Sequence, residues 1–203
     1  LHGQADINIR QTGKRQQHPP HMTITLHDAG IKTGSSIADI SRINGRIQVD
    51  DSSLKAENLR AHLGQSPLTV QATIKDFSTP TLQLDVNAPA IRADELIFYS
   101  DKAVLRDLVG HLELSKERLI LEQVGVQLDG GTQATVNGKI EFAPVEVHLD
   151  IASEFANIGE VIALWTDAPA GDRPQKFKKT QGSDPKPQQA KVTINAEAKR
   201  GDL

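Results

Sequence analysis

The sequence predicts an all-β protein whose tandem antiparallel β-meanders, each about 65 residues long, form a long, twisted and curled sheet. We expect this sheet to have an apolar concave face and few short helices. Three observations lead to the prediction. Apolar and polar residues alternate along most of the chain, turn-forming residues separate the alternating segments, and the whole pattern recurs after a fixed interval.

Alternation with a period of two residues is typical of strands that bury one face. The clearest alternating segments are residues 22–26, 68–74, 82–88, 145–151 and 192–198. Turn signals between strands include residues 64–67, 77–80 and 129–131. Helical patterns are weak and short, and they fall on residues 93–99, 102–108 and 158–165.

A shift of 65 positions brings the apolar pattern into register with itself, so that Gly45 falls on Gly110. Both copies then skip one residue at the same place. In the first copy the apolar residues are Leu54, Ala56, Leu59, Ala61 and Leu63, and in the second they are Leu119, Leu121, Val124, Val126 and Leu128. Because a β-bulge inserts one extra residue and restores the buried face, we expect bulges near residues 57–58 and 122–123.

Each copy is long enough for a meander of about four strands, which must extend a common sheet to bury its apolar face. The predicted organisation places a partial repeat at 1–44 and full units at 45–109 and 110–165. A proline- and lysine-rich insertion at 166–189, which we expect to be disordered, and a strand beginning the next unit at 190–203 follow.

Composition narrows the possible functions. Aromatic residues make up only 3% of the chain, so the apolar face must be aliphatic. The net charge is −3, from 23 basic and 26 acidic residues, which argues against a nucleic-acid-binding protein. Cysteine is absent, and no apolar run approaches the roughly 20 residues of a membrane-spanning helix. We expect any membrane anchor to lie in segments outside this sequence.

Residues capable of catalysis or metal binding do not form a recognisable motif. His18 and His21 flank two prolines, but two histidines without a third ligand make a poor metal site. Asp129 suits an Asp-Gly turn, and the repeat-equivalent Asp85 and Asp150 suit outward positions that pair across strands. Trp165 is expected to anchor the end of a short helix. We therefore predict no enzyme activity, no cofactor and no metal.

The repeated unit, in which Gly45 or Gly110 precedes two alternating strands, resembles the AsmA-like family of Gram-negative envelope proteins. Residues 66–77 with 80–86 resemble the family's hairpin, and residues 90–96 resemble its link between units. The resemblance implies an inner-membrane-anchored protein of the periplasm whose β-groove carries phospholipid toward the outer membrane. Phospholipid or acyl chains are the implied partners, with other envelope proteins as further partners. No catalytic residues are implied.

The sequence leaves two alternatives for the arrangement of the sheet around the apolar face and two for the function of the protein. The sheet either curls into an open groove lined with aliphatic side chains or closes on a second sheet as a sandwich. The protein either binds lipid or supports outer-membrane assembly as a scaffold without holding lipid. The candidate groove residues include three pairs at equivalent positions of the two copies, which are Leu82/Val147, Leu84/Leu149 and Val86/Ile151. The full set is Leu82, Leu84, Val86, Val145, Val147, Leu149 and Ile151.

Overall fold

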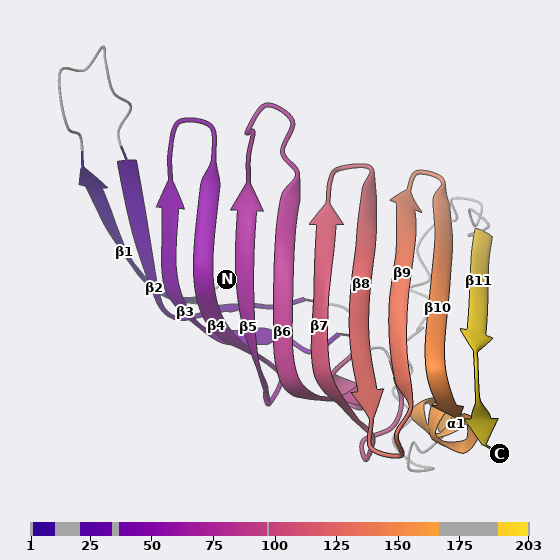
Figure 1. The fold of residues 1–203 in the computed structure, drawn as a ribbon. Coiled ribbons are helices and arrows are strands. Elements are labelled where there is room, and N and C mark those ends of the chain that lie inside the picture. The colour runs from indigo at the N-terminus through magenta and orange to yellow at the C-terminus, as the bar shows by residue number, and fades with distance from the viewer. Residues whose placement is uncertain (1, 11–20, 34–36, 97, 167–190, 203) are drawn as a thin grey trace, which may run out of the picture.

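The computed structural model describes residues 2–10, 21–33, 37–96, 98–166 and 191–202. Within these residues the chain forms one sheet in which eleven strands follow one another in sequence order, with a short twelfth strand beside the tenth (Figure 1). The strands are β1 His2–Arg10, β2 His21–Ile31, β3 Ile40–Val49, β4 Leu54–Leu63, β5 Ser66–Ile74, β6 Leu82–Arg92, β7 Val104–Leu114, β8 Arg118–Leu128, β9 Gln133–Phe142, β10 Val145–Asn157, β11 Lys191–Ala198 and β12 Gly201–Asp202.

The all-β prediction is confirmed. Helix in the described residues is limited to a 3-10 turn, η1 Ala93–Glu95, and one α-helix, α1 Ile158–Thr166. The prediction of a helix at residues 102–108 is wrong, because β7 begins at Val104. Leu105 and Leu108 are three positions apart, a spacing that also occurs in helices, but here a bulge at Asp107, whose φ is 49°, separates them within the strand.

The meander repeats in space as it does in sequence. Strands β3 to β6 are followed by η1, and strands β7 to β10 are followed by α1. The bulges lie where the sequence predicts them, since the register shifts between Ala56 and Leu59 and again between Leu121 and Val124. Asn58 and Gln123 have φ values of 52° and 50° at these bulges. A second pair of positive φ values, also 65 positions apart, occurs at Arg42 and Asp107.

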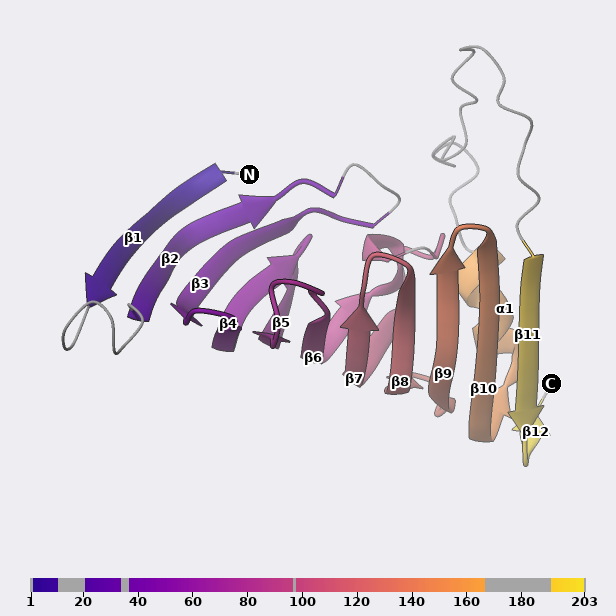
Figure 2. The ribbon, with the colours of Figure 1, turned by 90° about the horizontal axis from the view of Figure 1, so that it is seen from above.

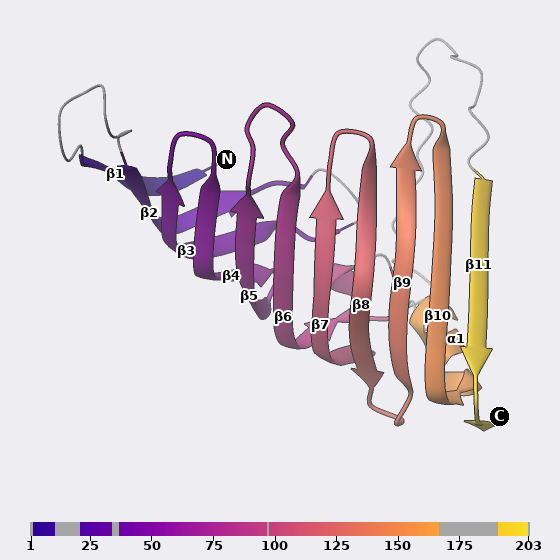
Figure 3. The same cartoon turned by 45° about the horizontal axis from the view of Figure 1, so that its top comes forward.

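The sheet is strongly twisted and curled but not closed. Figure 3 shows the strands rotating steadily from β1 to β11, and Figure 2 shows the sheet bowed around the side on which α1 lies. Repeated bulges account for this shape, because each one bends its strand and increases the local twist. Within the described residues no second sheet covers either face, so the sandwich alternative is wrong.

The two C-terminal strands depart from the predicted antiparallel meander, because β11 and β12 both run parallel to β10. All neighbouring pairs from β1 to β10 are antiparallel, whereas β11 runs parallel to β10. Strand β10 ends at Asn157, and β11 starts beside Glu146, near the beginning of β10. Strand β11 therefore begins at the end of the sheet opposite to α1. The predicted insertion at 166–189 lies, apart from Thr166, outside the described residues.

Two clusters of buried apolar side chains lie at the end of the sheet where the links between units pass. One cluster joins Leu63, Ala88 and Ile91, and the equivalent cluster one unit later joins Ala93, Leu105, Leu128 and Leu164. Leu164 comes from α1, so the helix covers this end of the sheet. Trp165 anchors the helix as expected, because its ring lies edge-on to Phe98 with centroids 5.0 Å apart.

Two glutamates 65 positions apart fasten these links to the preceding hairpin turns. A carboxylate oxygen of Glu95 accepts a hydrogen bond from the backbone N–H of Gln65 at 2.7 Å. Its equivalent, Glu160, accepts from the backbone N–H groups of Gly130 and Thr132. A carboxylate is a strong acceptor for turn N–H groups, so each glutamate fixes the link after one hairpin to the turn inside the same unit.

Candidate functional site: the apolar face of the sheet

Apolar residues form three continuous rows across one face of the sheet. Residues paired across neighbouring strands project to the same side, so the register defines each row. The central row consists of Ile7, Ile24, Ile47, Ala56, Ala72, Leu84, Leu112, Leu121, Gly138, Leu149 and Ile194. No polar side chain interrupts this row from β1 to β11.

The rows on either side have the same character. The upper row, nearer the β3–β4 turn, consists of Ile9, Met22, Val49, Leu54, Ile74, Leu82, Leu114, Leu119, Ile140, Val147 and Val192. The lower row consists of Ala5, Leu26, Gly45, Leu59, Val70, Val86, Gly110, Val124, Val136, Ile151 and Ala196. At the two bulges of the lower row, Gly45 lies against Leu59 and Gly110 lies against Val124.

This apolar face is the concave face. The same alternation places Leu105 and Leu128 on it, and α1 packs against both residues through Leu164. Because the sheet curls toward the side occupied by α1, the three rows line the inside of the curl (Figure 2). Small side chains on the concave face leave more space inside the curl. Among them, Ala56, Ala72 and Ala88 are also among the most buried residues.

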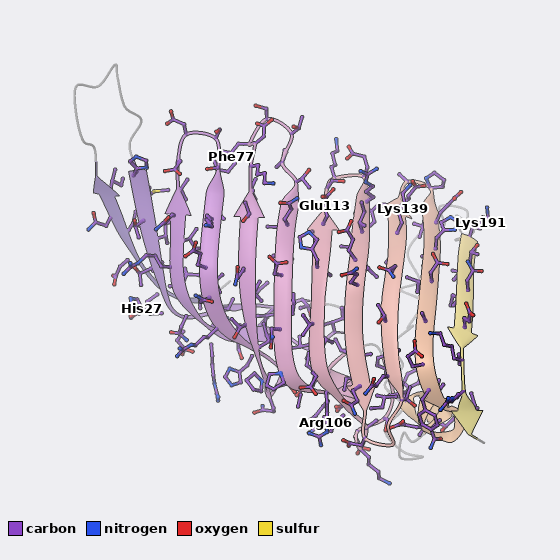
Figure 4. The ribbon with its side chains drawn as sticks, in the orientation of Figure 1. His27, Phe77, Arg106, Glu113, Lys139 and Lys191 are labelled. Atoms are coloured by element: carbon purple, nitrogen blue, oxygen red, sulfur yellow. The ribbon has the colours of Figure 1, made fainter. Side chains whose placement is uncertain are left out.

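The opposite, convex face is polar. The row that backs the central and upper rows consists of Asn8, Thr23, Gln48, Lys55, Thr73, Gln83, Glu113, Ile120, Lys139, His148 and Thr193. Glu113 and Lys139 project from this face toward the viewer in Figure 4. Every residue of this convex row except Ile120 is therefore polar, whereas the rows of the concave face are apolar.

Cross-strand polar pairs stabilise the convex face, and both predicted aspartate pairings are confirmed. Asp85 lies 2.8 Å from Nδ1 of His111, and Asp150 accepts a hydrogen bond from the Asn195 amide at 2.8 Å. The side-chain hydrogen bond and charge of Lys139 lower the pKa of Glu141. Since these groups are exposed and paired with one another, they form a solvated surface and no catalytic arrangement of nucleophile and base.

The seven candidate groove residues all lie on the apolar face. Leu82 and Val147 belong to the upper row, Leu84 and Leu149 to the central row, and Val86 and Ile151 to the lower row. Val145 lies beyond the upper row, opposite Phe142, and is 37% exposed. The candidates on β6 do not contact the candidates on β10, because β7, β8 and β9 lie between these two strands.

The strands between β6 and β10, and those before β6, supply further apolar residues that are not among the seven candidates. Ile47, Leu112 and Leu121 carry the central row between the candidate positions and toward the N-terminal edge. Their alternation is as regular as that of the selected segments. Apart from Val145, the candidate residues were equivalent positions on β6 and β10, one strand in each copy. The register shows instead that the apolar surface is built from rows that cross every strand.

The convex face also carries a hollow of about 410 Å³, which includes Gln127, Thr135 and the ion pair of Glu154 with Lys199. No group of three or more His, Asp or Glu residues in the described part of the chain is arranged to hold a metal ion. None of the described helices is both long and apolar enough to cross a membrane. His18 lies outside the described residues, and His21 pairs with Asp50.

Comparison of the chain with protein-family models, with curated proteins and with solved structures finds no match.

Proposed function

We propose that the protein is a non-enzymatic module that binds acyl chains of phospholipid along its concave apolar face and allows them to move along it. The observation that carries the proposal is the set of three uninterrupted apolar rows on a curled face that no second sheet covers in the described part of the chain. A water-soluble fold rarely leaves so extended an apolar surface without a partner. An acyl chain fits this surface because it needs dry, continuous aliphatic contact and no specific polar partner.

The dimensions of the rows suit lipid tails. Strands lie about 4.8 Å apart, so the ten spacings between eleven strands give a row of about 48 Å. The hydrocarbon core of a bilayer is about 30 Å thick and holds two layers of tails, so one tail spans about 15 Å. A row is therefore about three tails long, and a tail bound at one place finds equivalent contacts farther along.

The expected affinity is moderate, which suits a conduit. Full burial of one methylene is worth about 0.8 kcal/mol, but a tail lying on an open floor is covered on about half its surface. A dozen methylenes then give about 5 kcal/mol before the cost of association, and contacts with the curled walls add to this. Binding of this strength permits both capture and release.

We further propose that the protein belongs with the AsmA-like proteins it resembles and acts in the periplasm of a Gram-negative bacterium, anchored to the inner membrane by segments outside this sequence. Phospholipid moving toward the outer membrane is then the natural ligand. The resemblance rests on the repeated hairpins, the bulges and the links, and the geometry of the concave face is consistent with it.

Paired substitutions on opposite faces test lipid binding. Leu84→Asp and Leu149→Asp place a carboxylate in the central row, whereas Gln83→Asp and His148→Asp place the same group one residue away on the convex face. We expect the first two variants to bind a fluorescent fatty acid much more weakly than the wild type, and the second two to bind it normally. Equal binding by all four variants would contradict the assignment of the lipid to the concave face.

A scaffold that supports outer-membrane assembly without holding lipid is the alternative. The unpaired edges of the sheet favour it, since an exposed strand edge can pair with another chain. Native mass spectrometry of the purified protein after incubation with phospholipid distinguishes the two functions. Bound phospholipid supports the conduit, and a spectrum of lipid-free protein alone would support the scaffold.

A further inference from the structure

The two edge strands end the apolar rows abruptly. In the described residues, β1 pairs only with β2 and β11 only with β10. Ile7 and Ile9 on β1 are 62% and 66% exposed, and Val192 and Ile194 on β11 are 58% and 56% exposed. On the interior strands, most members of the same rows are half-buried or buried. Within the residues that the structure describes, each edge therefore lacks the neighbouring strand that covers side chains elsewhere in the sheet.

The strand directions allow the two edges to pair with each other. Strict alternation over eleven strands would give β11 the direction of β1. The parallel pairing of β11 with β10 reverses this, so that β1 and β11 run in opposite directions (Figure 1). A second copy that placed its β1 beside β11 would thus form an antiparallel pair, which is the more stable arrangement per residue.

A single register brings all three rows together across such a junction. Opposing Ile7 to Ile194 continues the central row, and the same register opposes Ile9 to Val192 and Ala5 to Ala196. On the convex face, the same register forms the pairs Asn8/Thr193, Asp6/Asn195 and Gln4/Glu197. None of these is a pair of like charges. A slip by one residue would put apolar residues opposite polar ones. A slip by two residues would keep apolar residues opposite one another, but it would join the central row of one copy to the upper or lower row of the next.

We propose that β11 of one copy of this chain pairs with β1 of a second copy, antiparallel, with Ile194 opposite Ile7. Each junction uses one edge of each molecule and leaves the other edges free. The association is therefore head-to-tail and can continue into a series. It joins the concave faces of successive copies into one longer apolar surface. The junction involves six residue pairs, so it is small and the affinity is low for a protein interface.

Charged substitutions on the two edges test the head-to-tail geometry. Ile7→Lys blocks the β1 edge and Ile194→Lys blocks the β11 edge. Both side chains are more than half exposed, so a lysine there remains solvated and the fold is preserved. Sedimentation equilibrium of each variant alone, without lipid, should show a monomer at concentrations where the wild type associates. Ile162→Lys, at a 53% exposed position of α1, should associate like the wild type.

Mixing the two blocked variants gives the decisive result. One intact β1 edge and one intact β11 edge remain, so an equimolar mixture should form a 1:1 heterodimer and nothing larger. A mixture that stays monomeric, or a wild type that does not associate at any concentration reached, would overturn the proposal. Continued self-association of either variant alone would indicate pairing of like edges and would overturn it as well.

Disulfide trapping tests the register independently. The sequence contains no cysteine, so Asn8→Cys in one copy and Thr193→Cys in another provide the only thiols. Oxidation of the mixture should give a covalent dimer, whereas Asn8→Cys mixed with Lys191→Cys, displaced by two residues, should give much less. Equal yields would contradict the register. These measurements contain no lipid, so their failure would leave the proposed lipid binding untouched.

Discussion

Gly110 provides a sharp test of the repeated bulge. A Cβ atom built at this position would lie 2.8 Å from Cγ2 of Val124 and 3.2 Å from its Cα atom. The first contact involves a stiff β-branched side chain and the second involves backbone, so neither can be relieved without movement of β8. The equivalent Gly45 would meet Leu59 at 2.7 Å and its Cα at 3.3 Å.

The expected cost of Gly110→Ala follows from these contacts. Insertion of a methyl group into a tightly packed position typically costs about 1–3 kcal/mol. Gly45→Ala should cost more, because Gly45 also has a φ of 149°, a strained conformation for alanine that adds about 1–3 kcal/mol. For a domain of about 200 residues, each kcal/mol lowers Tm by roughly 2–4 °C.

Urea unfolding of these variants measures the free energies directly, and Gly125→Ala serves as the matched control. Gly125 lies in the neighbouring strand, and the nearest atom to its Cβ would be 3.9 Å away, so this variant should retain wild-type stability within about 0.5 kcal/mol. Adding Val124→Ala to Gly110→Ala should recover part of the loss in a double-mutant cycle. If Gly110→Ala is as stable as Gly125→Ala, the close packing at the bulge is refuted.

Three further predictions concern the links, the bulges and acid stability. Glu95→Ala should destabilise the fold by about 1–3 kcal/mol in urea unfolding, because the partly buried hydrogen bond from the N–H of Gln65 to the Glu95 carboxylate is lost; an unchanged midpoint would show that the link does not depend on this bond. Gln123→Gly should raise stability by about 0.5–1 kcal/mol and Asn58→Gly should change it little, since asparagine tolerates positive φ better than glutamine; equal effects would contradict this reasoning. Hydrogen bonds from Ser78 N–H and the Thr79 hydroxyl lower the pKa of Asp76, so its contribution is present above the unfolded-state pKa and is lost as pH falls through the folded-state pKa. Asp76→Asn should therefore lose less stability than the wild type between about pH 5 and about pH 3, and parallel pH profiles would refute this.

The regular part of the fold could be predicted from sequence because its signals are local. Alternation defines which side of a strand is buried, and the three-residue skip from Leu121 to Val124 can be read directly as a bulge. The same skip misled the interpretation of residues 102–108, where Leu105 and Leu108 have helical spacing. A short segment with this spacing does not distinguish a bulged strand from one helical turn.

Other features depend on contacts between distant residues. The hydrogen bond that Glu95 accepts from the N–H of Gln65 joins residues 30 positions apart, and no local pattern marks either partner. The parallel pairing of β11 depends on where the chain returns after α1, which alternation does not determine. The apolar rows were predicted only in part. The sequence shows which side chains are apolar and alternate along a strand, but their alignment across strands follows only from the strand register.

Photo-crosslinking with a phospholipid that carries a diazirine in its acyl chain tests the central claim most directly. Peptide mapping of the adducts reports which face of the sheet contacts the tail. The proposal predicts saturable labelling of row residues such as Leu84, Leu112 and Leu121, with unlabelled phospholipid as competitor. Labelling confined to convex-face residues such as Gln83 and Glu113, or no labelling that the competitor reduces, would contradict the binding of lipid tails by the concave face.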